Sequence, residues 1–383
     1  MAGTIIEGQL TRTRSSTIRF ALATEEDDAA IRRLLRENPM RGAINVSFER
    51  EPNYFHSVGI GGADDQTILA FEKGRLVCMG RCSIRDRYAN GETCRVGYLS
   101  DLRLDSSAQG RFDILRRGYQ FFHELHQDNP ADFYFTSVTA DNSRSLRFLQ
   151  RGLPGMPIYK PFADFVTLLI PVPRYQGKLS RLKSKEIKSE NGSQENLSEL
   201  VNFLNTHASR CNLSTVWDEE KILSLENHGL RLSDFNILFD DKKIIGCAAV
   251  WDQRDFKQVV IREYSRQLSF ARPFINFAAT LFNTPKLPPL GSTLAHGFLS
   301  PLVTASDDKE SLLALVESSL HIAAERGMEF LSVGFVANDP RLAVIRNQFR
   351  CREYRNRFFQ VRWPDSKRLA LNNNLIFPEV ALL

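Results

Sequence analysis

The sequence has no long apolar run. None of its hydrophobic stretches approaches the roughly 20 residues that cross a bilayer, and the longest, 165–172 and 244–251, have the length of strands. The first 20 residues are polar and basic without a continuous apolar stretch, so we expect no secretory signal there. These absences predict a cytoplasmic protein with no membrane partner.

The sequence also has no closely spaced cysteine pair. Its six cysteines lie mostly inside apolar, strand-like segments, a pattern that favours reduced thiols and predicts neither disulfides nor a metal site. The charge is nearly balanced, with 50 Lys and Arg against 45 Asp and Glu, a formal excess of +5. Charges of both signs alternate along the chain, so nucleic acid is not an expected partner. The one local cluster of arginines, 346–357, lies along a predicted strand and favours a solvated face.

What remains is a globular composition, 43% hydrophobic and 25% charged, over 383 residues. That length favours two domains. The segment 173–196 is rich in Lys, Ser, Asn and Glu, which is typical of a linker, with one short strand near Lys185–Ser189. We therefore predict domains at 1–172 and 197–383, joined by this linker.

The two halves share one order of predicted elements. In the first half we expect strands at 17–23, 67–72, 76–85, 94–104, 133–139 and 165–172, with helices at 25–37, 111–126 and 142–151. In the second half we expect strands at 235–239, 244–251, 259–264, 293–303, 330–336 and 358–364, with helices at 197–204 and 309–324. The segment 133–142 matches 330–339 in pattern, and 165–171 matches 358–364. This repetition predicts an α/β protein built from two copies of one unit.

The segment Tyr98–Arg111 runs from a strand through a loop into a helix. Its sequence, YLSDLRLDSSAQGR, resembles the central strand and acyl-CoA loop of the GNAT (GCN5-related N-acetyltransferase) superfamily. Independently of that resemblance, a turn at a helix N-terminus offers free backbone N–H groups to a pyrophosphate. Gly110 lets the backbone approach such a ligand closely. The family pattern has small residues where this chain has Phe112 and Ile114.

A second segment resembles the same superfamily. Asn142-Ser143-Arg144-Ser145-Leu146-Arg147-Phe148-Leu149 is similar to the family segment that follows strand five and flanks the pantetheine arm. Leu149 stands where the family often carries a tyrosine acid, so Tyr98 or Tyr159 is a candidate in its place. The resemblance implies an acyl-CoA N-acyltransferase fold, with a mixed, mostly antiparallel central sheet flanked by helices, in two copies in tandem. The cofactor-binding residues it implies are Leu102, Arg103, Leu104, Gln109, Gly110, Arg111, Phe112, Asp113, Asn142 and Ser145.

Acetyl transfer to an amine needs a deprotonated amine, a polarised carbonyl and a protonated thiolate. In the family, parallel strands four and five splay apart, which supplies an N–H group and a slot for pantetheine. Asp101 on strand four is the expected base, and Tyr98 the second expected catalytic residue. An alternative interpretation of Asp101 is a structural carboxylate paired with Arg95 or Arg103. The segment Phe48–His56 stands where the family's substrate-covering loop begins.

The corresponding loop of the second half, Thr304–Glu310, has three acidic residues and no glycine, so we expect no pyrophosphate site there. We also expect the aromatic segment Phe270–Phe282 to pack inside the protein or between domains. The predicted function is an acetyl-CoA-dependent N-acetyltransferase that acts on a small-molecule amine or a protein amino group. The alternative is an inactive GNAT-like binding or scaffold protein. The sequence leaves a homodimer open.

Overall fold

A computed structural model describes residues 18–40, 42–172, 187–282, 285–305, 308–364 and 369–383. The predictions for the first 17 residues, and for most of the linker, lie outside these ranges. Among the described helices, none is both long and apolar enough to cross a membrane.

The two halves share one order of strands and helices, apart from three additional elements in the second half, and the predicted elements are present. The first copy contains β1 (Ile18–Leu22), α1 (Asp28–Glu37), β2 (Ile44–Glu49), β3 (Asp64–Glu72), β4 (Arg75–Ala89), β5 (Glu92–Leu104), α2 (Phe112–Leu125), β6 (Phe133–Thr139), α3 (Ser143–Leu149) and β7 (Ile158–Pro171). The second copy contains β8 (Ile187–Asn191), α4 (Leu197–Ala208), β9 (Ser214–Thr215), α5 (Glu219–Ser224), β10 (Phe235–Asp240), β11 (Lys243–Trp251), β12 (Gln258–Tyr264), α6 (Arg266–Leu281), β13 (His296–Thr304), α7 (Lys309–Glu325), β14 (Phe330–Val336), α8 (Pro340–Gln348) and β15 (Arg352–Arg362). The strand expected near Lys185–Ser189 is β8.

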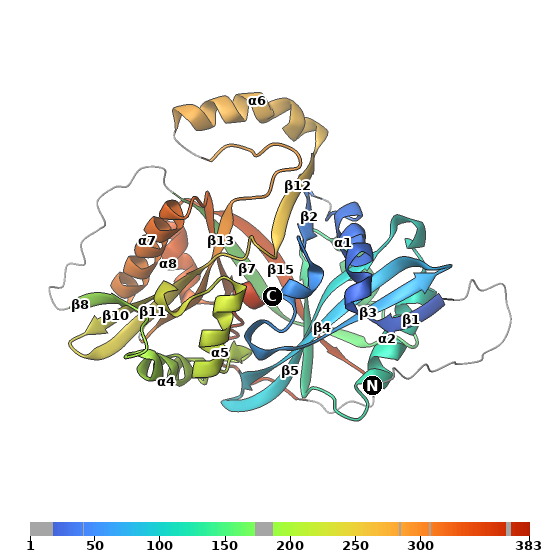
Figure 1. Cartoon of the computed structure of the whole chain (residues 1–383), viewed down its shortest axis with the longest axis horizontal. Helices are drawn as coiled ribbons and strands as arrows, with labels where there is room; N and C mark the ends of the chain where they lie inside the picture. The colour runs from blue at the N-terminus through green and yellow to red at the C-terminus, as the bar shows by residue number, and fades with distance from the viewer. Residues whose placement is uncertain (1–17, 41, 173–186, 283–284, 306–307, 365–368) are drawn as a thin grey trace.

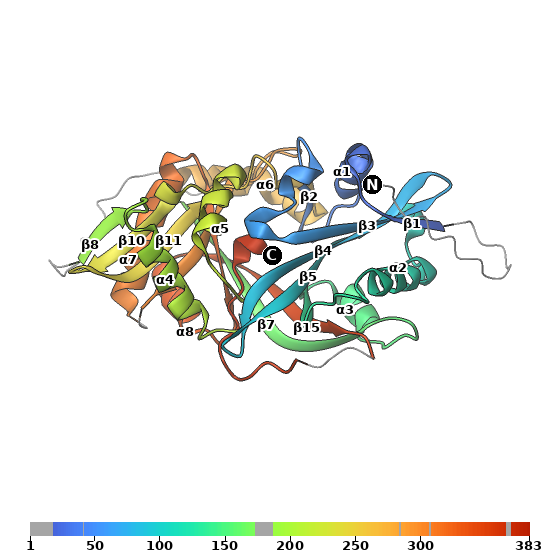
Figure 2. The same cartoon turned by 60° about the horizontal axis from the view of Figure 1, so that its bottom comes forward.

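One twisted sheet runs through the whole molecule (Figures 1 and 2). Over the described residues it has thirteen strands, twelve of them in the order β1-β3-β4-β5-β6-β15-β7-β14-β13-β11-β10-β8, with β9 beside β4. The order is symmetric about the central pair β15–β7, because each strand of the first copy has its counterpart at the same distance on the other side. Only β5–β6 and β13–β14 are parallel pairs, so the sheet is mixed and mostly antiparallel, as predicted.

The final strands of the two copies are exchanged. The sequence led us to expect that the strand at 165–172 would close the first unit, but β7 pairs with β14 and with β15 instead. The place beside β6 is taken by β15, from the end of the second copy. Phe165 on β7 stacks on Phe358 on β15, with ring centroids 4.9 Å apart. An alternating apolar pattern defines the buried faces of a strand but does not specify its neighbours, so the exchange cannot be predicted from the pattern.

Helices cover both faces of the first copy. Ile31, Leu34 and Leu35 form the buried stripe of α1, which packs on β3 and β4. The helices α2 and α3 lie on the opposite face, where Phe122 and Leu146 pack against a cluster that includes Tyr134 of β6. One face of β5 is therefore covered by α2 and α3, and its other face is turned toward the second copy.

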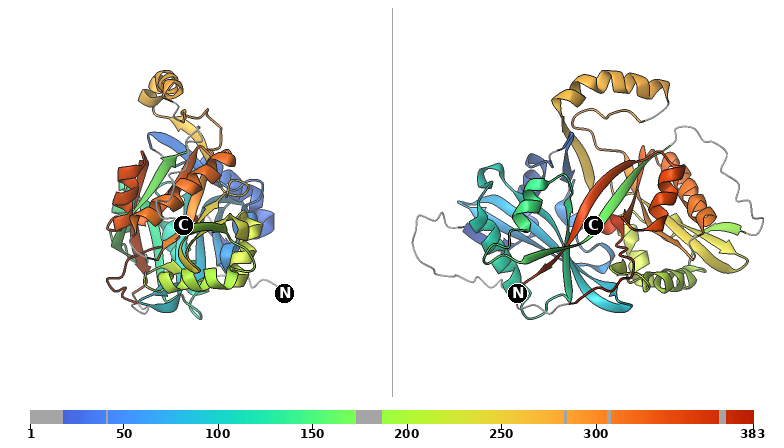
Figure 3. Two further views of the ribbon diagram at one scale, coloured as in Figure 1. Left: turned by 90° about the vertical axis from the view of Figure 1, so that its left-hand side faces the viewer. Right: turned by 180° about the vertical axis from the view of Figure 1, so that it is seen from behind.

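The helix α6 stands apart from the body, at the end of an arm that begins with β12 (Figures 1 and 3). The strand β12 pairs with β2 in a separate two-stranded sheet, rather than in the sheet of the second copy. The expected interior packing of Phe270–Phe282 is wrong, because Phe270, Phe274 and Phe277 are 82%, 71% and 69% exposed. The spacing shows that the helix is amphipathic, but spacing does not show which face meets the body.

Candidate functional site

The strands β5 and β6 separate halfway along their length. Their parallel pairing runs from Val96–Phe133 to Leu99–Thr136, although β5 continues to Leu104 and β6 to Thr139. The Thr136 hydroxyl donates to the Leu99 carbonyl, with 2.7 Å between the oxygens, at the last pair. Beyond it β6 stays paired with β15. The divergence therefore leaves an edge of β5 backbone that β6 does not cover.

A bulge lies on β5 where the divergence opens. Between Met79 and Arg81 the β4–β5 register shifts by one residue, so β5 carries one extra residue there. Asp101 lies in this stretch with φ +51°, a left-handed conformation that is uncommon outside glycine. Bulges re-aim side chains and interrupt regular pairing, and they are frequent beside active sites. Here the bulge places Asp101 next to Arg50, with 3.4 Å between carboxylate and guanidinium.

The Asp101 carboxylate keeps its charge despite burial, with its side chain only 11% exposed. Burial by itself raises its pKa, but nearby positive charges outweigh that effect and lower the pKa below its ordinary value. The cations responsible are Arg50, Arg81, Arg103 and Lys257. A carboxylate with a lowered pKa is a weak base, so the surroundings suit Asp101 better as a counter-ion than as a proton acceptor.

Lys257, just before β12, was not identified from the sequence. Its ammonium donates to the Leu383 carbonyl at 2.9 Å and lies 5.5 Å from the ring centroid of Phe298. Burial and, to a smaller extent, the positive charge of Arg50 lower the pKa of Lys257 to about 7, although Asp101 opposes the shift. Arg81 and Arg85 also lower the pKa of Lys257, and Lys257 in turn lowers the pKa of His296. A lysine with this pKa can accept a proton near neutral pH.

Tyr98 lies on β5 just before the divergence, on the same face as Lys257. Its hydroxyl is 2.7 Å from the Ser137 hydroxyl on β6, and its ring lies 4.9 Å from that of Phe135. Burial raises the pKa of Tyr98 to about 12, so the phenol is protonated at neutral pH. The side chain packs in a cluster with Leu383, on the face away from α2 and α3.

The predicted acyl-CoA loop follows β5 directly. Gln109 and Gly110 are exposed, and Gly110 has φ +85° with open space where a Cβ would be. The next residue, Arg111, is bidentate to Asp113, with both N···O distances 2.8 Å, and also contacts Glu72. The Asp113 carboxylate accepts from backbone N–H groups of the first helical turn, and Arg111 is the main cause of its lowered pKa. The start of α2 therefore already holds an internal anion.

The remaining predicted cofactor residues line the same end of β5. Phe112, 52% exposed, stacks on Phe148 of α3, with centroids 5.0 Å apart. Asn142 caps α3 by accepting from the Ser145 N–H at 3.1 Å. Leu102 is exposed, while Arg103 and Leu104 are half-buried on β5.

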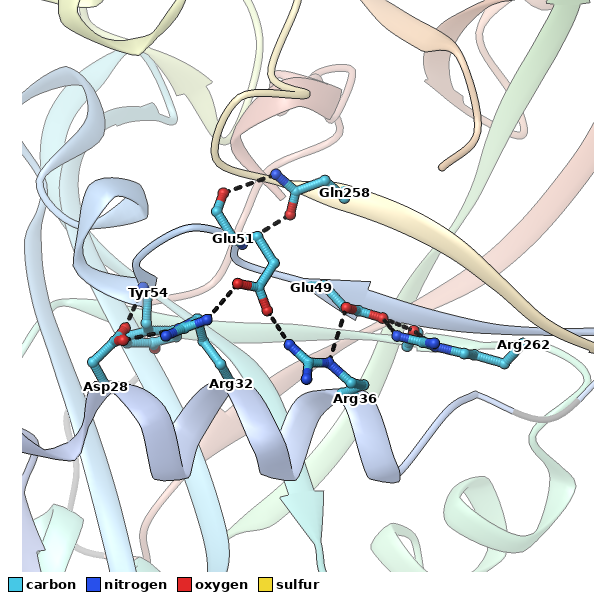
Figure 4. Close-up of polar contacts among 9 residues, drawn as sticks. Asp28, Arg32, Arg36, Glu49, Glu51, Tyr54, Gln258 and Arg262 are labelled. Atoms are coloured by element: carbon cyan, nitrogen blue, oxygen red, sulfur yellow. Dashed lines mark hydrogen bonds and ion pairs between the residues drawn. The ribbon is translucent and has the colours of Figure 1, made fainter. Parts of the chain in front are cut away.

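A ladder of ion pairs and hydrogen bonds joins α1 and β12 to the two glutamates on either side of Arg50 (Figure 4). Glu51 pairs with Arg32 and Arg36 of α1, and its backbone exchanges two 2.9 Å hydrogen bonds with the Gln258 amide. Glu49 pairs with Arg36 and with Arg262 of β12. Because neighbouring residues of an extended chain point to opposite sides, fixing both glutamates turns Arg50 toward Asp101. The segment Phe48–His56 thus reaches the site.

Comparison of the sequence with family models and with curated proteins gives no match. Comparison of the structure gives several. A GCN5-related N-acetyltransferase from Sphaerobacter thermophilus superposes over 93% of this chain and 98% of its own, with a TM-score of 0.54 and 10% identity. The N-myristoyltransferase of Saccharomyces cerevisiae, crystallised with myristoyl-CoA and inhibitors, superposes over 96% and 87%, with a TM-score of 0.61 and 12% identity.

The chain has the acyl-CoA N-acyltransferase fold, in two copies. At these identities the likeness shows the fold alone. The structure brings together on β5 and its following loop the predicted Tyr98, Asp101, Gln109 and Gly110. It adds Lys257, whose isolated position before a strand carries no recognisable sequence signal, and Ser137.

Proposed function

We propose that this protein is an N-acyltransferase that moves an acyl group from acyl-CoA to an amine. The observation that supports this most strongly is the divergence of β5 and β6 in a chain with the acyltransferase fold. The helix face of the divergence carries the loop with Gly110, and the other face carries Tyr98 and Lys257. Donor and acceptor would therefore approach the bulged strand from opposite faces.

The donor side would hold the pantetheine arm against the uncovered edge of β5, beyond Leu99. A backbone N–H there would polarise the thioester carbonyl, and the surrounding cations would stabilise negative charge on its oxygen. The pyrophosphate would lie at Gly110 and the start of α2. To bind there it must displace Asp113 from the first helical turn, after which Arg111 can pair with phosphate instead.

On the acceptor side, Lys257 would take the proton from the attacking amine. The amine nitrogen bonds to the carbonyl carbon, the carbon–sulfur bond breaks, and the departing thiolate takes the Tyr98 proton. The phenolate and the lysine ammonium then return to their starting states by proton exchange with solvent. Asp101 serves as a counter-ion that partly offsets the lowering of the Lys257 pKa by burial. The proposed base is therefore Lys257, whereas the sequence had suggested Asp101.

The acyl chain we propose is acetyl, as in the GCN5-related enzymes. The yeast N-myristoyltransferase binds the long-chain donor myristoyl-CoA, so chain length is a variable that the experiment should scan. The acceptor class is an amine on a small molecule or a protein.

The alternative is a binding protein without catalysis. The stacked pair Phe112–Phe148 and the ion pair Arg111–Asp113 favour it, because both lie where the donor would pass.

Calorimetry with acetyl-CoA, myristoyl-CoA and free CoA tests the proposal. We expect saturable binding of at least one acyl-CoA, and a release of thiol when a mixture of amines is added. If no CoA compound binds at millimolar concentration, the enzyme proposal is wrong. Binding without thiol release for any amine or for water would favour the binding protein.

A further inference from the structure

We propose that α6 docks on the surface of an anionic lipid bilayer. Its outer face is a single apolar stripe, because Phe270, Phe274, Phe277 and Leu281 recur at intervals of three and four residues. Their side chains are 67–82% exposed, and Phe282 at the end of the helix is 75% exposed. Contiguous exposed apolar surface of this kind marks an interaction site. The inference is independent of the acyltransfer proposed above.

The opposite face of the helix is anchored, so the stripe has a fixed direction. Leu268 and Ile275 pack on a small cluster with Tyr264 and Leu287. The Asn276 amide bonds both to the Leu287 N–H at 2.7 Å and to the Leu287 carbonyl at 3.1 Å. The helix therefore cannot roll its phenylalanines inward without losing these contacts.

The charge around the stripe is entirely positive over a long segment. From 264 to 306 the sequence has no Asp or Glu, whereas 45 such residues occur in 383. Arg266 and Lys286 are exposed and form no ion pair with any described residue. Glu263, just before this segment, accepts a hydrogen bond from the Asn45 amide.

A further cation near the foot of the arm is Arg352, the first residue of β15. Arg352 lies close enough to Tyr264 to influence its hydroxyl, whose pKa is raised by burial and lowered by the charges of Arg272 and Arg352. Arg350 and Arg352 are exposed and unpaired within the described chain. Glu353, the residue after Arg352, is paired with Arg346 and Arg355.

Aromatic side chains flanked by unopposed cations match the interface of an anionic bilayer better than an apolar protein groove. A helix with one apolar face and basic flanks lies in the headgroup region, with its apolar side chains reaching the acyl chains. The arm carries α6 outside the body, which allows contact with a flat surface (Figures 1 and 3). The absence of a spanning helix had suggested no membrane partner, but a helix that lies on a surface does not need to span it.

Flotation of the full chain with vesicles tests the proposal. We expect it to float with phosphatidylcholine vesicles that contain phosphatidylglycerol, and only weakly with phosphatidylcholine alone. The triple variant Phe270→Ser, Phe274→Ser, Phe277→Ser should weaken binding ~100-fold, since each phenylalanine loses its apolar burial. The double variant Arg350→Glu, Arg352→Glu should weaken it about fivefold or more per site.

The control is Leu22→Ser with Leu223→Ser, which removes side chains 41% exposed away from α6 and should leave binding unchanged. In Phe277→Trp, we expect tryptophan emission to shift to the blue when anionic vesicles are added. Equal binding of the triple variant, equal binding to both vesicle types, or an unshifted emission would overturn the proposal. Light scattering that shows a dimer, converted to monomer by the triple variant, would instead assign the stripe to a second copy of the chain.

Discussion

The two copies contain the same opening in their sheets and use it differently. In the second copy, β13 and β14 pair from His296–Phe330 to Phe298–Ser332 and then separate. The strand β13 also carries one extra residue against β11. There the C-terminal segment fills the opening. Ser300 donates to the buried Glu379 carboxylate at 2.6 Å, and a Cβ on Gly334 would lie 2.9 Å from the Cβ of Val380.

The helices that follow the two openings differ in the residue that precedes their first turn. The second copy begins α7 with Asp308, whose carboxylate accepts from the N–H groups of Glu310 and Ser311 at 3.1 and 2.9 Å. In the first copy, the residue before α2 is Arg111, which makes no capping bond. The C-terminal segment therefore joins the packed core at the second opening, whereas the first opening brings the buried ion pair of Arg50 and Asp101 to β5.

The largest effect should come from the glycine of the first loop. Gly110→Glu places a carboxylate and a strained left-handed backbone at the predicted pyrophosphate position, so acyl-CoA affinity should fall roughly 100-fold. A glutamate introduced at the start of α7 in the second copy, Lys309→Glu, should leave affinity unchanged. Calorimetry measures both; a loss of affinity in Lys309→Glu alone would move the donor to the second copy.

The second-largest effect should come from Lys257, which lies between the two copies. Lys257→Met should reduce turnover by about 10²–10³ without weakening donor binding, because only proton transfer is lost. In the unaltered protein the rate should rise with pH through about 7, as Lys257 loses its proton.

The Asp101→Asn variant separates the two candidate bases. Asp101 raises the pKa of Lys257, so without its charge the rise in rate should move to lower pH. If Asp101 were itself the base, its lowered pKa would give a flat profile near neutral pH, and Asp101→Asn would be inactive throughout. The pH–rate profile of both proteins decides between these outcomes.

A smaller effect is expected from the internal anion of the first loop. Asp113→Asn frees Arg111 and the first turn of α2, so acyl-CoA should bind about fivefold more tightly. Asp105, the first residue of the loop, is held by Arg75 and is the control site; Asp105→Asn should give no such gain. Unchanged affinity in Asp113→Asn would place the pyrophosphate elsewhere.

The smallest effect should be purely structural. Asp308→Ala removes the cap of α7 and should lower the free energy of unfolding by about 1 kcal/mol. Urea denaturation measures this change, and acyl-CoA affinity should not respond. A change in affinity would contradict the assignment of the second opening to the core.

Local features of the fold were predictable from the sequence. The strands expected at 67–72, 76–85 and 133–139 follow from periodicity, and they are observed as β3, β4 and β6. The partners of β7 and β15 were not predictable, because both copies offer an equivalent edge. Likewise, the resemblance located Tyr98 and Asp101 on β5, but no local pattern reveals that Lys257, over 150 residues away in the chain, belongs beside them.

The exchanged strands have a consequence for the order in which the protein can be assembled. The edge of β6 is covered by β15, whose first residue is Arg352. On a ribosome the first copy would thus expose a bare strand edge while nearly two hundred further residues are added, and such edges recruit unwanted partners. We expect the candidate site to form only after the second copy has been synthesised. Neither half should therefore work when it is expressed without the other.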